Sequence, residues 1–196
     1  GVTGKAFGAV VLWLLGYPDA ARDQSEQAIQ MSRNCSPSSR ALALHFAAMV
    51  HQIRRDPERT RQAADDCAAI ANEHGLSFWQ ASSGIYRGWA RAMLDDLVDG
   101  LNEMRAGLAA FEGVGTPEDL TVYYEMVAEV CLRAQRYDEG LRSLEDAFSQ
   151  AERHGILFWN AELHRRRGEL LLASGAPADA VHACFHAALD CARRQG

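Results

Sequence analysis

The chain has 196 residues, of which 48% are hydrophobic and 23% are charged, and its formal net charge is −6. This composition excludes a disordered chain and is enough for one sizeable core or for a series of stacked units. The negative charge argues against a nucleic-acid surface, which needs clustered Lys and Arg to displace counterions from phosphates, and Lys5 is the one lysine.

The first predicted element is a helix whose apolar side runs from Phe7 to Leu15. About ten apolar residues are too few to cross a bilayer, so we expect a buried helix and no contact with a membrane. Gly16 and Pro18 then form a turn, and a polar amphipathic helix follows to about Arg33.

Eight further helices are predicted by the same signals. Asp56-Pro57 ends one helix and starts the next, Gly75 is placed to cap a helix end in the left-handed conformation, and Thr116-Pro117 marks a capped start. No run of alternating β-branched residues predicts a strand. The helices pair into five antiparallel hairpins, and we expect them to form a single domain over residues 1–196, with hairpins at about 4–33, 39–73, 77–112, 117–153 and 157–194.

An internal repeat organises these hairpins. The segment Glu73–Ala81 returns as Arg153–Ala161, eighty residues later, and small residues mark a period of forty. They stand near the middle of the first helix and early in the second, where close helix approach excludes a bulky side chain: Ala48, Gly88, Ala128 and Gly168, then Thr60, Gly100, Gly140 and Ala180. The sequence therefore predicts an all-α, right-handed α-solenoid of about five hairpins.

A small residue at mid-helix and an aromatic at the turn (Tyr17, Tyr137) resemble the tetratricopeptide pattern, although the period is forty and the family's is thirty-four. The stretches Phe158–Leu172 and Tyr123–Leu141 resemble the helical-repeat region of large bacterial ATPase-linked signalling proteins, namely class III adenylate or guanylate cyclase fusions and LuxR-type ATP-binding transcriptional regulators. The resemblance implies a repeat array belonging to a larger protein. The chain has neither a cyclase catalytic segment nor a G-x-x-x-x-G-K-[ST] loop, so those activities are not implied.

The first helix of each hairpin is expected to line a concave groove, where such scaffolds bind. The side chains expected in this groove change from apolar and aromatic to acidic along the chain. Such a groove suits a ligand with a basic or hydroxyl-rich end and an apolar end. The alternatives are a merely solvated helical surface or one covered by other parts of the parent protein. The predicted groove residues are His45, Met49, Gln52, Trp89, Glu125, Glu129, Glu162, Arg165 and Glu169.

Other candidate sites have simpler interpretations. Trp79 and Trp159 are expected to pack against the preceding hairpin rather than to form a stacking platform. His182 and His186 lack a third ligand at a fixed spacing, so no metal site is predicted. Acidic pairs spaced four residues apart more often face solvent or an arginine such as Arg165 than perform catalysis, and we predict neither enzymatic activity nor a cofactor.

Five cysteines cannot all pair and form no C-x-x-C, which indicates reduced thiols and a cytoplasmic protein: Cys35, Cys67, Cys131, Cys184 and Cys191. We expect a sensor or interaction domain that binds a protein or peptide partner or a small-molecule effector, and no nucleic acid. The alternative is an assembly scaffold that needs no ligand. An apolar stripe on the last helix then predicts a homodimer through terminal helices: Val181, Cys184, Phe185, Ala188 and Leu189.

Overall fold

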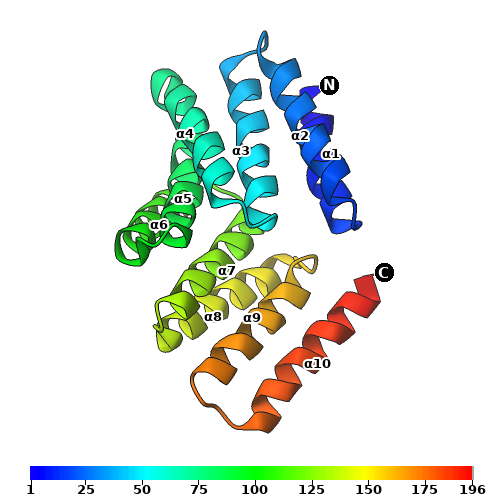
Figure 1. The fold of residues 1–196 in the computed structure, drawn as a ribbon, viewed down its shortest axis with the longest axis vertical. Helices are drawn as coiled ribbons and strands as arrows, with labels where there is room; N and C mark the ends of the chain where they lie inside the picture. The colour runs from blue at the N-terminus through cyan, green and yellow to red at the C-terminus, as the bar shows by residue number, and fades with distance from the viewer. Residues whose placement is uncertain (196) are drawn as a thin grey trace. The chain divides into compact units, whose positions relative to one another are not determined.

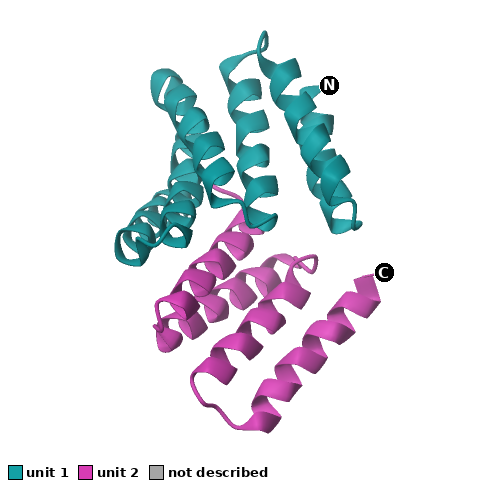
Figure 2. Ribbon diagram, in the orientation of Figure 1, with its two compact units in different colours: residues 1–114 teal, residues 115–196 magenta. Residues whose placement is uncertain are grey.

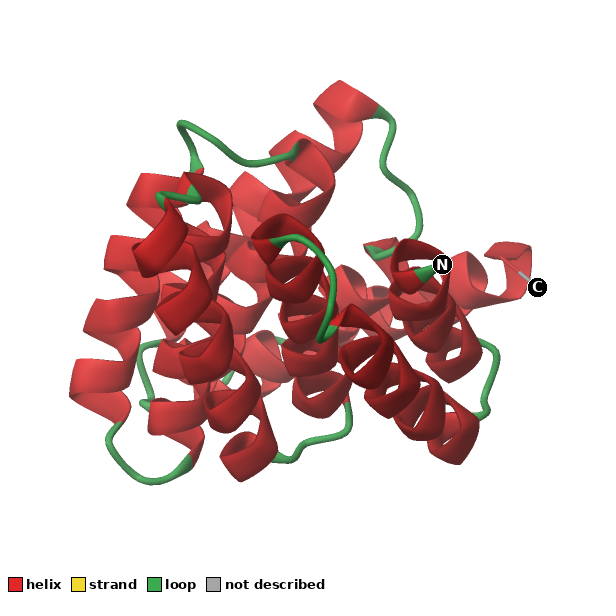
Figure 3. Cartoon of the chain, turned by 90° about the horizontal axis from the view of Figure 1, so that it is seen from above, coloured by secondary structure: helices red, strands yellow, loops and turns green. Residues whose placement is uncertain are grey.

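The computed structural model describes residues 1–195, and its regular structure is entirely helical (Figures 1 and 3). No strand occurs in these residues, and consecutive helices pair as five hairpins. The prediction of an all-α hairpin repeat is therefore confirmed. The helices are α1 (Val2–Leu14), α2 (Pro18–Ser32), α3 (Pro37–Ile53), α4 (Pro57–His74), α5 (Ser77–Met93), α6 (Leu97–Phe111), α7 (Pro117–Arg133), α8 (Tyr137–His154), α9 (Asn160–Ala173) and α10 (Ala178–Gln195).

The helices divide into two compact units (Figure 2). Unit 1 (Gly1–Val114) contains α1 to α6, and unit 2 (Gly115–Gly196) contains α7 to α10. In unit 1, α3 contacts α1, α2, α4 and α5; in unit 2, α9 contacts α7, α8 and α10. Each unit is thus a stack in which a hairpin packs on its sequence neighbour, whereas a single domain across both units stays a prediction.

Local sequence signals set the helix ends. The side chains of Ser36, Asp56, Asp96 and Thr116 each accept a hydrogen bond from a backbone N–H of the helix that follows. The turn between the two helices of a hairpin repeats as well, because its left-handed residue recurs every forty positions, at Arg55, Asp95, Gln135 and Gly175. The forty-residue period therefore describes backbone geometry as well as side-chain size.

The paired helices approach most closely where the repeat places glycine. A Cβ atom on Gly88 of α5 would lie 2.7 Å from the carbonyl oxygen of Gly100 on α6, and one on Gly100 would lie 2.6 Å from the carbonyl oxygen of Gly88. In the last hairpin the repeat equivalents of Gly88 and Gly100 are Gly168 and Ala180. A Cβ atom on Gly168 would lie 2.8 Å from the ring of Phe185 on α10, and Ala180 is exposed. The predicted close approach is confirmed for the third hairpin, while a side chain separates the backbones in the fifth.

Three expectations from sequence were wrong. The first helix is not buried on its apolar side: only Ala6 and Ala9 of α1 are in the core, whereas Val11 is 51% exposed. The stripe on α10 is uncovered only in part, because Val181 and Ala188 are buried, whereas Leu189 is 51% exposed. Finally, the last hairpin begins at Asn160 and not at residue 157, so the repeated Phe-Trp pair precedes the helix there.

We expect Gly88→Ala to lower the free energy of unfolding by about 1–3 kcal/mol, because the new methyl group meets backbone atoms of α6 that cannot move independently. Gly84→Ala on the same helix is the matched control. Its Cβ would lie 3.6 Å from the nearest atom, so the lower chain entropy of alanine should stabilise the protein by about 0.5–1 kcal/mol. Urea unfolding of both variants measures the difference, and equal effects would contradict the close-approach interpretation.

Candidate functional site

The groove residues predicted in unit 1 lie in the protein interior. His45 on α3 is 3% exposed, its Nδ1 lies 3.2 Å from Ser82 Oγ, and rings of α3 and α5 surround it. Burial lowers the pKa of His45 to about 3, so the ring is neutral at ordinary pH. The structure therefore places His45 as an uncharged, packed side chain among the rings of Phe46, Phe78, Trp79 and Tyr86.

The other three predicted residues of unit 1 are also buried. Met49 and Gln52 are 8% and 4% exposed, and Trp89 is fully buried. A side chain without exposed surface reaches a ligand only after the helices around it move. The role of these residues in binding stays a prediction.

In unit 2 the predicted residues form one group. Glu125 and Glu129 are one turn apart on α7, and Glu162, Arg165 and Glu169 follow one face of α9, the helix that contacts α7. Packing α7 against α9 brings these side chains around Arg166, which is not among the predicted groove residues. We call the six residues the charged cluster: Glu125, Glu129, Glu162, Arg165, Arg166 and Glu169.

Arg166 is the centre of the charged cluster. Its Nε donates a hydrogen bond to Glu125 Oε1 at 2.7 Å, and its Nη1 donates one to Glu169 Oε2 at 2.8 Å. Its Nη2 lies 3.2 Å from Glu129 Oε1. The side chains of Arg166 and Glu125 are only 5% and 3% exposed, so this is a buried ion network that joins α7 to α9.

Burial and charge oppose each other in this network. Burial alone would lower the pKa of Arg166, but attraction to Glu125 and Glu129 outweighs it and raises the pKa. For Glu125, burial dominates and, despite the attraction of Arg166, raises its pKa to about 7. Four carboxylates around two guanidiniums leave two formal negative charges uncompensated when all six groups are ionised, and a proton on Glu125 removes one of them.

The outer part of the charged cluster is accessible. Arg165 donates a hydrogen bond to Glu162 at 2.7 Å and pairs with Glu169 as well. The three side chains are 35%, 28% and 33% exposed. This rim offers acidic groups to solvent, while Glu125 and Glu129 lie behind it.

Arg166 could have been found from the repeat. The forty-residue register aligns it with Phe46, Tyr86 and Met126, which are apolar, and the structure buries Tyr86 and Met126 completely. An arginine at a core position must find acids, because an unpaired buried charge is very costly. The sequence pattern favours Arg165 as the partner of Glu125 and Glu129, whereas the structure pairs both acids with Arg166.

The tryptophan prediction is confirmed for Trp79, which packs against the cluster of Ala41, Leu44, Cys67 and Ile70 from the preceding hairpin. Trp159 is 7% exposed and lies just before α9.

Among the described residues, no group of three or more His, Cys, Asp or Glu side chains could hold a metal ion. None of the helices in residues 1–195 combines the length and apolarity needed to cross a membrane.

Comparison with known proteins agrees with this architecture. Bacillus thuringiensis PlcR, solved with the peptide PapR7 and DNA, superimposes with a TM-score of 0.78 over 97% of this chain and 69% of PlcR, at 13% identity. A signal-transduction ATPase from Pyrococcus horikoshii with a tetratricopeptide repeat sensor superimposes with a TM-score of 0.64 over 96% of this chain and 30% of that protein, at 14% identity. The fold is a divergent tetratricopeptide-like repeat array.

Other likenesses concern repeats and length. Tetratricopeptide-like repeats of a Podosopora anserina kinesin light chain match with a TM-score of 0.60 and 12% identity, over 98% of this chain and 94% of that one. No protein-family model matches the sequence. An uncharacterized protein of Rhizobium meliloti is 29% identical over 189 residues, which are 96% of this chain. The chain spans 18% of the length of that relative.

Arg166→Ala should lower the free energy of unfolding of unit 2 by about 3–5 kcal/mol, because it leaves Glu125 and Glu129 buried without their cation. Arg167→Ala is the matched control: Arg167 is exposed and lies 6.0 Å from the Phe148 ring centroid, an interaction worth about 1 kcal/mol or less. Urea unfolding followed by circular dichroism measures both, and similar losses in the two variants would contradict a structural role for the network.

The raised pKa of Glu125 also predicts a pH dependence. The folded chain holds the carboxyl proton of Glu125 more tightly than the unfolded chain does. The contribution of this proton to the free energy of unfolding is therefore full below pH 4.5 and is lost as pH rises through about 7. Glu125→Gln keeps the uncharged form at every pH. The free energy of unfolding of the wild type, relative to this variant, should therefore fall by about 1–3 kcal/mol between pH 5 and pH 8. A pH-independent difference would show that Glu125 stays ionised.

Proposed function

We propose that this chain is a non-catalytic sensor or protein-interaction domain, and that the charged cluster binds a partner peptide or small ligand carrying a cationic group beside an apolar one. The observation that carries this proposal is the excess of acids over arginines on adjacent faces of α7 and α9. A cationic ligand group supplies the charge that the network lacks, and partial burial strengthens its attraction to the acids.

The fold supports the same class of function. Stacked helical hairpins present extended surfaces, and PlcR, whose fold this chain shares, was solved with a peptide. The ATPase of Pyrococcus horikoshii is described as carrying such repeats as its sensor. By this likeness we propose that the chain is part of a larger cytoplasmic protein of bacterial signalling or transcription regulation, in which ligand binding biases an attached output domain such as an ATPase, cyclase or DNA-binding module.

Selection of random heptapeptides displayed on phage against the purified chain tests the ligand chemistry. We expect enriched peptides to carry Lys or Arg next to apolar residues. Fluorescence polarisation should then show binding weakened roughly five- to twenty-fold by the double substitution Glu162→Gln with Glu169→Gln, which removes the two accessible acids of the cluster. The wild type and the Glu152→Gln variant serve as references. Glu152 is exposed on α8 and lies outside the charged cluster.

Enrichment without cationic residues, or equal binding by the double variant with its circular dichroism unchanged, would overturn the proposal.

The alternative function is an assembly scaffold that joins copies through the terminal helices. Exposed apolar side chains on both terminal helices favour it: Phe7, Val11 and Leu14 on α1 and Leu189 on α10. A chain that dimerises in sedimentation equilibrium and enriches no peptide would support this alternative.

A further inference from the structure

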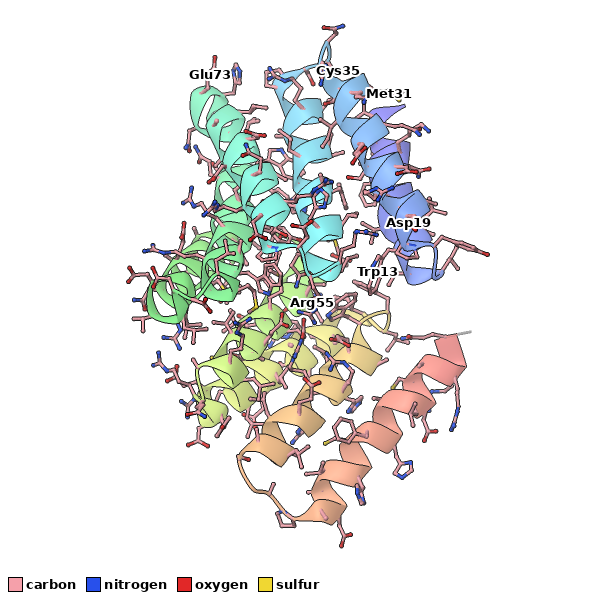
Figure 4. All side chains as sticks on the ribbon, in the orientation of Figure 1. Trp13, Asp19, Met31, Cys35, Arg55 and Glu73 are labelled. Atoms are coloured by element: carbon pink, nitrogen blue, oxygen red, sulfur yellow. The ribbon has the colours of Figure 1, made fainter. Side chains whose placement is uncertain are left out.

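A hollow of about 380 Å³ lies within unit 1, between the C-terminal halves of α2 and α4 and above the N-terminal half of α3. Figure 1 shows α3 between these two helices, and Figure 4 labels Glu73 near the end of α4. Helix α3 contacts both neighbours, and an ion pair between Glu26 of α2 and Arg59 of α4, at 3.5 Å, joins the two outer helices away from the hollow. The residues that line the hollow are Ile29, Ser32, Arg33, Arg40, Leu44, Asp66, Ala69, Ile70 and Glu73.

The floor of the hollow is apolar and firmly packed. Leu44 and Ile70 are each 8% exposed and belong to a core cluster, against which Ile29 and Trp79 pack. The floor therefore exists before any ligand arrives, and an apolar group placed on it would leave water without disturbing the core.

The walls of the hollow carry opposite charges on opposite sides. Arg33 ends α2 and Arg40 lies on α3, one turn before Leu44. Asp66 and Glu73 lie seven residues apart on α4, which places them on one face of that helix, on either side of Ile70. Two cations thus face two anions across an apolar floor.

These charges do not neutralise one another. No carboxylate of residues 1–195 lies within ion-pair distance of the Arg33 or Arg40 guanidinium. Asp66 accepts a hydrogen bond from Gln62 at 3.0 Å, and Glu73 lies 3.9 Å from the ring of its neighbour His74. Both walls therefore remain available to an added molecule that carries both charges.

We propose that this hollow binds a short zwitterionic peptide: its apolar side chain lies on Leu44 and Ile70, its terminal carboxylate pairs with Arg33 and Arg40, and its terminal ammonium pairs with Asp66 and Glu73. The volume suits a ligand of roughly two or three residues. The reverse orientation would place like charges together, whereas this one lets the guanidinium groups bind the carboxylate in a planar, two-point geometry. The site belongs to unit 1 and shares no residue with the charged cluster.

NMR chemical-shift titration of the ¹⁵N-labelled chain with trileucine tests the proposal. Because exposed ion pairs contribute little, we expect weak binding, with a Kd on the order of 0.1–1 mM, and shifts centred on the amides of Leu44 and Ile70. N-acetylated trileucine and trileucine amide should each bind about three- to ten-fold more weakly, because each lacks one terminal charge. Equal binding by the free and blocked peptides would overturn the proposal.

Substitutions then assign each end of the peptide. Arg40→Gln and Glu73→Gln should each weaken trileucine binding by about three- to ten-fold. Acetylation should weaken binding less in the Glu73→Gln variant than in the wild type, because only Asp66 is then left to pair with the ammonium. Arg61→Gln and Glu58→Gln remove the same charges from exposed positions of α4 outside the hollow, and they should leave binding unchanged. Shifts absent at millimolar peptide, or equal losses in test and control variants, would contradict the site.

Discussion

A helix of this chain can bury its apolar side only against another helix, and this constraint governs the rest of the structure. Where the backbones of α5 and α6 meet, Gly88 and Gly100 bring carbonyl oxygens within a distance that excludes even a methyl group. Every hairpin then packs on its sequence neighbours within its unit, as the contacts of α3 and α9 show. Because such packing is local and repetitive, the architecture supplies surfaces and hollows between helices.

The two units satisfy this constraint with different chemistry at equivalent positions. In unit 1 the equivalent position holds the aromatic Tyr86, which lies beside the buried His45, and burial lowers the pKa of His45 so that its ring is neutral at ordinary pH. In unit 2 the equivalent positions are Met126, which is buried, and Arg166, whose charge requires the acids of α7. A buried ion network stabilises little compared with an apolar core of the same volume.

The candidate sites could be predicted only in part. Helical spacing placed the acids of α7 and α9 on facing surfaces, and the structure brings them together. Spacing did not reveal that Arg166 points inward, because adjacent arginines have the same local pattern and only the packing of two helices decides which one is buried. The hollow over α3 was not predicted either, since it depends on the separation of α2 and α4, which no sequence signal reports.

The sequence by itself determined the helices, the caps at Gly75 and Thr116 and the forty-residue repeat, because caps, turns and small-residue positions act over a few residues. It also determined that Trp79 packs on the preceding hairpin. Tertiary structure alone decided the exposure of α1 and the delayed start of α9, where the repeated Phe-Trp pair leaves the helix. The physical reason is that burial depends on which neighbour is present, so identical local sequences reach different environments in different hairpins.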